Sequence, residues 1–543
     1  MTDDLGALGY TLPSEATATA FYEEFAWALP ERYNVAAATL DARAPADRTA
    51  LRHVDASGER HAFTYSALRE AVDAVAAGLA EAGVGRGDRV AVRLPTCPEL
   101  LAVHLGALRL GAVVVPLSVL LGDEAVSDAL DRTAPTVYVA DAEYRADADA
   151  SAAEAVLEVT PGRYADRGPV GDLGSLARAD AAVEAAATAP DDPAMVLFTS
   201  GTSGAPKGAL VPHSYLAGSL PGYHCWFHLF SLDDAADARV WTPAEWAWAG
   251  ALFDVVYPTL ALGGTVVSRC RRSGFDPEVG LSLLREADVS HAFLPPTAVA
   301  QLRSAGVDAA PRALDVVMCG GESLAPDLRR WAEDALDAVV NEAYGQTEAN
   351  ATVGNCAAAF EANPGSIGKA YPGHEVAVVD DDGCAVPAGE RGELVVELPD
   401  PVAFLRYWDD PEATARTVRD GRLHTGDLAR RRADGHLVHA GRADELVVTA
   451  GYRVDPLEVE RTLADHPAVV EAVVGGVPDD ERGERVKAAV LPVADATPSD
   501  ELAADLRDFV RDRIGAHKAP REVSFVSDLP ATRTGKADRE DLL

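Results

Sequence analysis

TSGTSGAPKG, residues 199–208, is the stretch around which the rest of the chain is arranged. Apolar segments flank it, PAMVLF at 193–198 and ALV at 209–211, and both are typical of short buried strands. Its ten residues include three glycines, four hydroxyl side chains and one lysine, Lys207. Glycines let backbone N–H groups approach an anion closely, and hydroxyls and lysine add donors and positive charge. This composition predicts a phosphate-binding loop, although a flexible polar hairpin loop can have the same residues.

The chain contains 543 residues, of which 86 are acidic and 48 basic, giving a formal net charge of −38. A chain of this length exceeds one hydrophobic core and predicts about two or three domains. The negative charge argues against nucleic acid and anionic membranes as partners. We expect a salt-rich cytoplasm of the haloarchaeal kind, where a dense carboxylate surface stays hydrated and its self-repulsion is screened. A codon bias toward Ala and Arg is the alternative, but it leaves the acidic excess unexplained.

Targeting and disulfide patterns are missing from the sequence. The N-terminus is acidic and no run approaches the roughly 18 apolar residues of a membrane helix, so we expect a soluble cytoplasmic protein without membrane insertion. The six cysteines include no C-x-x-C pair, which indicates reduced thiols. Only five lysines occur, and two of them, Lys207 and Lys536, lie in glycine-flanked loops. A flexible point charge in such loops indicates a task that the rigid arginine fork does not suit.

Helical and strand patterns alternate through the first part of the chain. An amphipathic helix that ends at Gly83 precedes an apolar strand at 89–94, and a helix at 99–110 precedes a strand at 112–116. This alternation predicts an α/β fold with a largely parallel sheet covered on both faces. Residues 375–398 instead predict an antiparallel subdomain around a D-D-D-G turn.

Four further stretches carry candidate functional residues: GES at 321–323, NEAYGQTEAN at 341–350, the long segment 423–460, and TGK at 534–536. With the loop at 199–208, they resemble the motifs of the adenylate-forming superfamily. That superfamily contains acyl-CoA synthetases, luciferases and the adenylation domains of peptide synthetases. Within it, the chain resembles the medium-chain and acetyl-CoA synthetase-like branch.

The resemblance implies two domains of different size. The large N-terminal domain, residues 1–443, would have parallel-rich sheets flanked by helices plus an antiparallel subdomain, and would bind ATP and the acyl group. A small mobile α+β domain, residues 444–543, would follow and carry the catalytic lysine, Lys536. Asp444 would be the hinge between them. A charged, flexible tail is the structural alternative for the region around Lys536.

The ATP- and AMP-binding residues that the resemblance implies are spread over all of these motifs. They are Thr199, Ser200, Gly201, Thr202, Ser203, Gly204, Lys207, Gly321, Glu322, Ser323, Tyr344, Gly345, Gln346, Thr347, Asp427, Arg442 and Arg453. Tyr344 would lie against the adenine, Thr347 would contact the α-phosphate, and Asp427 would bind the ribose hydroxyls. A carboxylate is a natural acceptor for a ribose diol, and an arginine is a natural donor to phosphate oxygens.

The catalytic residues implied by the resemblance are Lys536, Thr347 and Glu348. Glu348 would hold Mg²⁺ together with Thr202, because Mg²⁺ takes hard oxygen ligands and shares them with the triphosphate. Lys536 would bridge the substrate carboxylate and the α-phosphate and stabilise the charge that develops between them.

The acyl pocket is expected at Trp246, Trp248 and Gly345, although tryptophans of this kind are as often core residues. Acetyl-CoA synthetases carry a bulky tryptophan in the place of Gly345. A glycine there therefore predicts an acid larger than acetate, of short to medium length, branched or aromatic. The CoA arm is expected along residues 449–452, which are Thr449, Ala450, Gly451 and Tyr452.

These residues together predict an ATP-dependent acyl-CoA synthetase. A carboxylic acid would attack ATP to give acyl-AMP and pyrophosphate, and coenzyme A would then displace AMP. ATP, Mg²⁺ and coenzyme A are the expected cofactors and co-substrates of a monomer or homo-oligomer. The chain departs from the family pattern at Glu445, where many relatives have aspartate, and at Val448, where many have lysine. The alternatives are an enzyme that loads a carrier-protein pantetheine and a catalytically silent nucleotide-binding sensor.

Overall fold

The computed structural model of the chain describes most of its residues. They are residues 8–11, 13–41, 45–145, 149–162, 177, 181–199, 206–272, 274–306, 310–363, 365–449, 452–479, 483–493 and 496–527. The chain divides into two compact units, one formed by Met1–Val376 and Val396–Leu423 and the other by Ala377–Val395 and His424–Leu543. The sequence also predicts a domain boundary after residue 443, beyond which the chain moves as a separate domain. That boundary describes motion and stays a prediction.

The first unit contains a seven-stranded sheet with the order β20-β10-β9-β6-β5-β7-β8. Its strands are β5 (Arg89–Arg93), β6 (Val113–Pro116), β7 (Val137–Asp141), β8 (Ala155–Val159), β9 (Pro193–Thr199), β10 (Lys207–Pro212) and β20 (Arg406–Tyr407). The strands from β9 to β8 run parallel to their neighbours, whereas β10 is antiparallel to both β9 and β20. The strands expected on either side of the glycine-rich loop are confirmed as parts of β9 and β10.

The second sheet of this unit has nine strands in the order β17-β16-β15-β14-β13-β11-β12-β3-β4. They are β3 (Thr49–Val54), β4 (Arg60–Thr64), β11 (Arg239–Trp241), β12 (Thr265–Arg269), β13 (His291–Phe293), β14 (Val316–Gly320), β15 (Val339–Gln346), β16 (Ala349–Gly354) and β17 (Lys369–Ala370). The strands between β3 and β15 are parallel, and the edge strands β4, β16 and β17 are antiparallel to their neighbours. The predicted α/β class with parallel-rich sheets is therefore confirmed.

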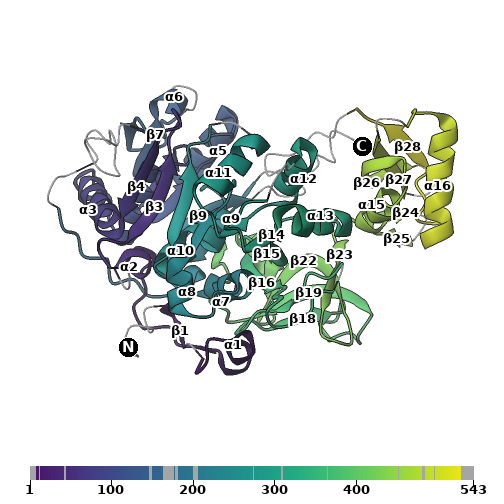
Figure 1. The fold of residues 1–543 in the computed structure, drawn as a ribbon, viewed down its shortest axis with the longest axis horizontal. Coiled ribbons are helices and arrows are strands. Elements are labelled where there is room, and N and C mark those ends of the chain that lie inside the picture. The colour runs from purple at the N-terminus through teal and green to yellow at the C-terminus, as the bar shows by residue number, and fades with distance from the viewer. Residues whose placement is uncertain are drawn as a thin grey trace. The chain divides into compact units, whose positions relative to one another are not determined.

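Helices join the strands and cover the two sheets (Figure 1). They are α1 (Ala18–Glu24), α2 (Val35–Leu40), α3 (Tyr65–Glu81), α4 (Pro98–Arg109), α5 (Asp123–Thr133), α6 (Ala142–Arg145), α7 (Tyr215–Phe227), α8 (Leu232–Asp237), α9 (Ala249–Ala251), the π-helix η3 (Leu252–Val256), α10 (Tyr257–Ala261), α11 (Pro277–Glu286), α12 (Pro296–Ala305), α13 (Pro326–Leu336) and α14 (Pro411–Thr417). Two short strands, β1 (Tyr10–Thr11) and β2 (Ala26–Trp27), pair with each other.

Close packing of α3 against α4 forms part of the core of the first unit. Every residue of α4 is buried, as expected for a helix that is covered on all sides. A Cβ atom at Gly106 of α4 would come within 2.9 Å of Val75 Cγ1 and 3.2 Å of the Ala76 backbone nitrogen on α3. The glycine is therefore what lets the two helix backbones approach each other.

The remaining strands form two smaller sheets. One contains β18 (Val376–Val379), β19 (Arg391–Glu397), β21 (Val418–Arg419), β22 (Arg422–Arg431) and β23 (Leu437–Arg442). The other contains β24 (Val447–Thr449), β25 (Tyr452–Val454), β26 (Val469–Asp479), β27 (Gly483–Pro492) and β28 (Glu522–Phe525), with the helices α15 (Pro456–Ala464) and α16 (Asp500–Ile514). This last group has its own apolar core and is the small α+β fold that the sequence predicted for the C-terminal part.

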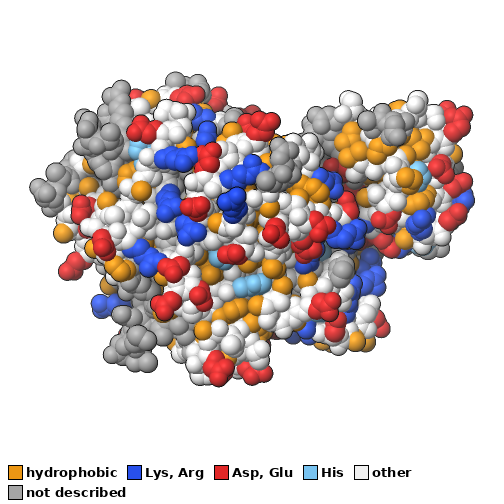
Figure 2. Space-filling model, viewed as in Figure 1, with side chains coloured by type: hydrophobic (Ala, Val, Ile, Leu, Met, Phe, Trp, Pro, Cys, Tyr) orange, Lys and Arg blue, Asp and Glu red, His pale blue; other side chains and the backbone are white. Residues whose placement is uncertain are grey.

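Charged side chains are spread over the molecular surface. Figure 2 shows acidic and basic groups interspersed on the face in view, and no single patch of one sign covers it. None of the helices in the described part of the chain has the length and hydropathy that crossing a membrane requires.

The contact between α3 and α4 gives a test of the core. Gly106→Val should destabilise the protein by about 1–3 kcal/mol, because the added methyl groups overlap backbone atoms of α3 that have no space to move into. The measurement is the urea unfolding midpoint. Gly274→Ala is the matched control, since a Cβ atom at Gly274 has no neighbour within 4 Å. Equal midpoints for the two variants would show that the helices separate at little cost.

Candidate active site

The glycine-rich stretch is anchored at both ends by the β9–β10 hairpin. Thr199 lies opposite Lys207 in the antiparallel register, and Thr199 Oγ1 donates a hydrogen bond to the Lys207 carbonyl oxygen at 3.3 Å. The hairpin therefore places Lys207 at the base of the loop that the sequence predicts to bind phosphate. The loop residues themselves lie outside the described part of the chain, and their roles stay predictions. They are Ser200, Gly201, Thr202, Ser203 and Gly204.

Tyr407 connects the lysine of this loop with the predicted metal ligand. Its strand β20 pairs with β10, which places Tyr407 opposite Ala209. The ammonium nitrogen of Lys207 lies 5.2 Å from the centroid of the Tyr407 ring, a cation–π distance. The Tyr407 hydroxyl donates a hydrogen bond to Glu348 Oε1 at 2.5 Å. One tyrosine thus joins two motifs that are separated by 140 residues in the sequence.

Glu348 is held in a tight turn between β15 and β16. Its side chain is largely buried, with 7 % of the residue exposed. The backbone carbonyl of Glu348 accepts a hydrogen bond from the Phe404 amide at 2.8 Å, and the carbonyl of Thr347 accepts one from the Tyr215 hydroxyl at 3.0 Å. The turn that carries both predicted catalytic residues is therefore fixed by side chains and backbone from two other segments. A buried carboxylate oxygen next to a phosphate loop has the hard-donor chemistry that suits Mg²⁺.

Gly345 has a backbone reason to be glycine. The register of β15 against β16 shifts between Tyr344 and Gln346, which marks a bulge. A Cβ atom at Gly345 would lie 2.2 Å from the Ala351 backbone nitrogen. A side chain here would therefore force the two strands apart. The expectation that Gly345 leaves space for the acyl group stays a prediction beside this structural requirement.

The GES turn and the predicted adenine-binding tyrosine lie at one edge of the nine-stranded sheet. β14 ends at Gly320, which is opposite Ala343 of β15 in the parallel register. Gly321 and Tyr344 are the next residues of the two strands and therefore lie side by side at this edge of the sheet. Carboxyl ends of parallel strands are the usual place for ligands in such sheets. Gly321 has φ of +87° and leaves space for the Trp248 ring, which is 3.2 Å from the position of a Cβ atom there. Glu322 and Ser323 complete this turn.

The two tryptophans predicted for the acyl pocket differ in their surroundings. Trp246 is 2 % exposed and belongs to the main hydrophobic core of the unit. Trp248 is partly buried, with its ring 5.5 Å from the Phe293 ring and next to Gly321. Trp248 therefore lies beside the GES turn, where a pocket residue is expected. The pocket role of both tryptophans stays a prediction.

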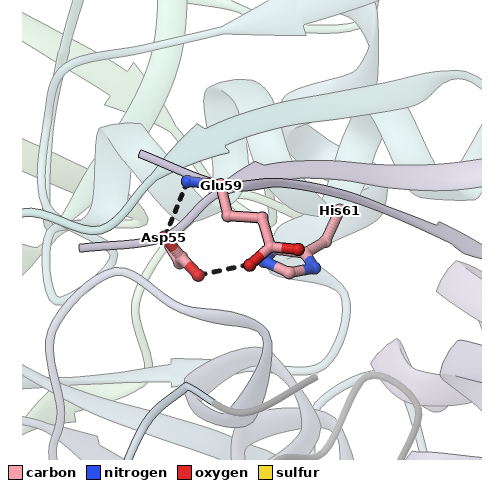
Figure 3. A group of neighbouring side chains, drawn as sticks. All are labelled: Asp55, Glu59 and His61. Carbon is pink, nitrogen blue, oxygen red and sulfur yellow. Dashed lines mark hydrogen bonds and ion pairs between the residues drawn. The ribbon is translucent and has the colours of Figure 1, made fainter. Parts of the chain in front are cut away.

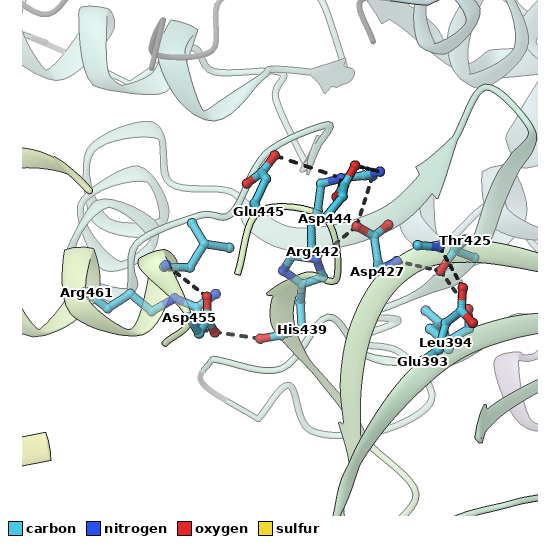
Figure 4. Close-up of polar contacts among 12 residues, drawn as sticks. Glu393, Leu394, Thr425, Asp427, His439, Arg442, Asp444, Glu445, Asp455 and Arg461 are labelled. Atoms are coloured by element: carbon cyan, nitrogen blue, oxygen red, sulfur yellow. Dashed lines mark hydrogen bonds and ion pairs between the residues drawn. The ribbon is translucent and has the colours of Figure 1, made fainter. Parts of the chain in front are cut away.

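Asp427, Arg442 and Asp444 form one charged group in the second unit (Figure 4). Asp427 on β22 faces Arg442 on β23, and their side chains are 3.3 Å apart. Arg442 also donates to both carboxylate oxygens of Asp444, at 2.9 and 3.2 Å. Burial opposes the charge of Arg442, but the hydrogen bonds to Asp444 and the charge of Asp427 raise its pKa above the ordinary value. The predicted ribose ligand and the predicted hinge residue thus share one guanidinium.

Other predicted residues of this unit are described only in part. Thr449 at the end of β24 is 7 % exposed. Tyr452 and Arg453 belong to β25, and their side chains lie outside the described part of the chain, as do Ala450 and Gly451. Lys536 lies there as well, so its catalytic role stays a prediction.

A separate cluster of possible metal ligands occurs in the β3–β4 turn and consists of Asp55, Glu59 and His61 (Figure 3). Asp55 Oδ1 accepts hydrogen bonds from the amides of Ser57 and Glu59, and Oδ2 lies 3.0 Å from His61 Nε2. Although burial opposes the charge, these hydrogen bonds lower the pKa of Asp55 to about 2. The cluster is therefore accounted for by the closure of the turn.

Comparison with known proteins agrees with this arrangement. The family model described as "AMP-binding enzyme" matches residues 38–408, and that of the "AMP-binding enzyme C-terminal domain" matches residues 458–536. The chain belongs to the AMP-binding enzymes. It is an ATP-dependent acyl-CoA synthetase, an AMP-forming ligase that works through an acyl-adenylate.

Relatives of known name cover almost all of the chain. A feruloyl-CoA synthase of an Amycolatopsis species is 35% identical over 508 residues, which are 91% of this chain and 95% of the relative. A mitochondrial acyl-coenzyme A synthetase of Rattus norvegicus is 32% identical over 95% of this chain and 90% of its own length. The structure of ATP-bound MatB from Rhodopseudomonas palustris superimposes with a TM-score of 0.83 at 28% identity, covering 94% of this chain and 98% of that one.

Sequence reasoning missed Tyr407 and Tyr215. Neither residue lies in a stretch with an unusual composition, and each acts by contacting a motif more than 50 residues away along the chain. The pairing of β20 with β10, which brings Tyr407 to Glu348, involves two residues of β20 only. So short an edge strand leaves no periodic pattern by which the sequence could have indicated it.

The hydroxyl of Tyr407 can be tested apart from its ring. Tyr407→Phe keeps the aromatic ring near Lys207 but removes the donor to Glu348 Oε1. Loss of such a supporting hydrogen bond should weaken divalent-metal binding about tenfold to a hundredfold. The measurement is Mn²⁺ binding by electron paramagnetic resonance in the presence of a non-hydrolysable ATP analogue. Tyr144→Phe is the control, because the Tyr144 ring also contacts arginines but lies on helix α6, away from Glu348 in the sequence. Unchanged Mn²⁺ affinity in Tyr407→Phe would contradict a role for this bond.

Proposed function

We propose that the enzyme activates a carboxylic acid larger than acetate, of short to medium length, branched or aromatic, and transfers it to free coenzyme A. The observation that carries the activation step of this proposal is the Lys207–Tyr407–Glu348 arrangement beside the hairpin of the glycine-rich loop, whereas the acid and the acceptor follow from the family resemblance. It places a flexible cation and a buried carboxylate next to each other, which is what binding of a metal–triphosphate requires. A carboxylate ligand alone would repel the phosphates, and a lysine alone would leave the metal without a protein ligand.

The residues divide the first half-reaction among themselves. A carboxylate is a poor electrophile, so the acid attacks the α-phosphate of ATP to form acyl-AMP and release pyrophosphate. Glu348 and Thr202 would hold Mg²⁺, which would supply positive charge to the phosphate oxygens. Lys207 orients the phosphates at the base of the loop, and Thr347 positions the α-phosphate. Lys536 bridges the two anionic reactants and offsets the charge that develops between them.

The second half-reaction needs a different arrangement of the small domain. The CoA thiol attacks the acyl carbon and AMP leaves, so Lys536 must withdraw to admit the pantetheine arm. Rotation of residues 444–543 about Asp444 achieves both, with residues 449–452 turning toward the CoA arm. The pair between Arg442 and Asp444 is next to this pivot and must rearrange during the rotation.

The names of several relatives support an acid with a ring. They include the feruloyl-CoA synthase mentioned above and solved structures of a benzoate CoA ligase from Burkholderia xenovorans and of an anthranilate CoA ligase. Trp248, partly buried beside the GES turn, offers an apolar ring to such an acid, and the buried Phe293 ring lies behind it at 5.5 Å. A stand-alone enzyme that loads a carrier-protein pantetheine would use the same groups and is the second candidate.

The setting of the enzyme is part of the same proposal. A net charge of −38 supports a cytoplasm rich in salt, in keeping with a haloarchaeal origin in the medium-chain and acetyl-CoA synthetase-like branch. We expect a monomer or homo-oligomer that binds small molecules and neither nucleic acid nor membranes.

The decisive experiment is acid-dependent AMP release with Mg-ATP and CoA in high salt, across acetate, butyrate, 2-methylbutyrate, hexanoate, octanoate and benzoate. Activity that peaks beyond acetate is the expected result. Activity should fall at low salt, because unscreened carboxylates then repel one another. If acyl-AMP forms but CoA never accelerates turnover, the carrier-loading function takes the place of the CoA ligase. If no acid supports ATP–pyrophosphate exchange, the chain is a nucleotide-binding sensor.

Asp444 provides the test of domain rotation. Asp444→Pro fixes the backbone at the proposed pivot, so acyl-AMP formation should persist while thioester formation falls by about tenfold or more. Pyrophosphate exchange measures the first step and acyl-CoA production the second. Asp444→Asn is the matched control, because it weakens the pair with Arg442 but leaves the backbone free. Equal loss of both steps in Asp444→Pro would refute the hinge.

A further inference from the structure

Asp254 is a buried carboxyl group in the apolar segment that precedes β12. It is 7 % exposed and lies in η3, the single π-helical turn between α9 and α10. Every other residue of η3 is apolar and buried. π-helical turns are rare and occur often at functional sites, because they turn one side chain out of the regular helical sequence. The structure therefore places an ionisable group where the surrounding sequence consists of core residues.

Among the described residues, Asn350 is the hydrogen-bond partner of the Asp254 carboxylate, and it contacts one oxygen. Oδ1 accepts a hydrogen bond from Asn350 Nδ2 at 2.5 Å. Asn350 also donates to Ser219 Oγ, at 3.1 Å, on α7. Within the described part of the chain, the structure gives Oδ2 no hydrogen-bond donor. The residue as a whole is 7 % exposed, so a donor that a ligand supplies to Oδ2 would replace contact with water that is already limited.

Asp254 Oδ2 and the Trp248 ring border the same space beside Gly250. A Cβ atom at Gly250 would lie 3.2 Å from Asp254 Oδ2 and 3.1 Å from two carbons of the Trp248 ring. The space that a side chain at Gly250 would fill therefore lies between the carboxylate and the ring. The same edge of the ring also borders Gly321 of the GES turn, because Trp248 Cη2 is 3.2 Å from the position of a Cβ atom there. Asp254 is thus beside the residue of the predicted acyl pocket that contacts the predicted adenine site.

Among the described residues, no cationic side chain compensates the charge of Asp254. Burial raises the pKa of its carboxyl group to about 7, and the hydrogen bond from Asn350 opposes this shift only in part. Burial and this hydrogen bond are its two causes, so no cationic side chain contributes. A ligand that brought a positive charge or a strong donor would therefore gain an interaction that the protein does not satisfy by itself.

We propose that Asp254 Oδ2 recognises a hydrogen-bond donor on the acyl group, so that the preferred acid carries an amino or hydroxyl substituent in addition to its carboxylate. This inference rests on the proposed function and narrows its substrate class. Asp254 becomes a specificity-determining residue: the apolar wall of Trp248 accepts the body of the acid, and the carboxylate fixes the polar substituent. A site built for such a donor rejects the analogue that lacks it, because a buried acceptor is then left unpaired.

The first experiment compares matched acids with the unmodified enzyme. Benzoates with an amino, hydroxyl or methyl group at position 3 or 4 have nearly the same shape, as do 6-aminohexanoate, 6-hydroxyhexanoate and heptanoate. AMP release should give kcat/KM about tenfold or more higher for at least one donor-bearing acid than for its methyl analogue. The amino and hydroxyl members of each set distinguish a cationic from a neutral donor. If every methyl analogue is used as well as or better than its amino and hydroxyl partners, the inference is overturned.

The second experiment changes the carboxylate. Asp254→Asn keeps the size of the side chain and should reduce the preference for the favoured donor-bearing acid by about tenfold, while Asp254→Leu should favour the methyl analogue. Ser219→Ala is the control, because it removes the next hydrogen bond of the network and leaves Asp254 in place. An unchanged ratio between the favoured acid and its methyl analogue in Asp254→Asn assigns the carboxylate to holding Asn350 and contradicts the inference.

Failure of the inference can be separated from failure of the proposed function. An enzyme that forms acyl-CoA only from unsubstituted acids keeps the proposed function and contradicts the role of Asp254. An unmodified enzyme that forms acyl-AMP from no acid contradicts both. If a variant does not fold, as judged by its thermal unfolding, the ratios measured with the unmodified enzyme still decide the question.

Discussion

The hydrogen bond from Tyr407 to Glu348 is the interaction on which the nucleotide part of the site depends. It crosses from the short edge strand β20 of one sheet to the β15–β16 turn of the other. A buried carboxylate needs a donor, and a carboxylate predicted to bind metal needs a fixed orientation; the phenol provides both. The same ring lies near Lys207, so the position of the cation and that of the carboxylate are set by one side chain.

The turn that carries Thr347 and Glu348 is unusually constrained for a functional loop. Tyr215, Phe404 and Tyr407 each hold one of its polar groups, and the bulge at Gly345 fixes its entry from β15. Preorganisation of this kind lowers the cost of arranging charges when substrate binds. Asn350 extends the constraint to Asp254, so the groups predicted to face the nucleotide and the group proposed to face the acid are linked through the same strand, β16.

The sequence predicted the α/β class because alternating strands and helices leave a local apolar pattern, which the parallel sheets confirm. Its motifs predicted Glu348 and Lys207 as functional residues through a family resemblance, and the structure brings them to the same tyrosine. Tyr407 and Asp254 were not predictable in this way. The first acts through a two-residue strand pairing, and the second through a π-helical turn inside an apolar run. Both depend on contacts between distant segments, which propensity and periodicity do not register.

The scarcity of lysine has a chemical consequence for an enzyme of this kind. Four of its five lysines belong to the described residues, and each is engaged: Lys207 and Lys369 near aromatic rings, Lys487 and Lys518 with glutamates. Acyl-adenylates and acyl thioesters are acylating agents, and the unprotonated amine of lysine is the nucleophile they modify most readily, whereas arginine stays protonated. A surface whose positive charges are almost all arginines therefore offers the enzyme's own reactive intermediate few places at which to modify the protein that made it.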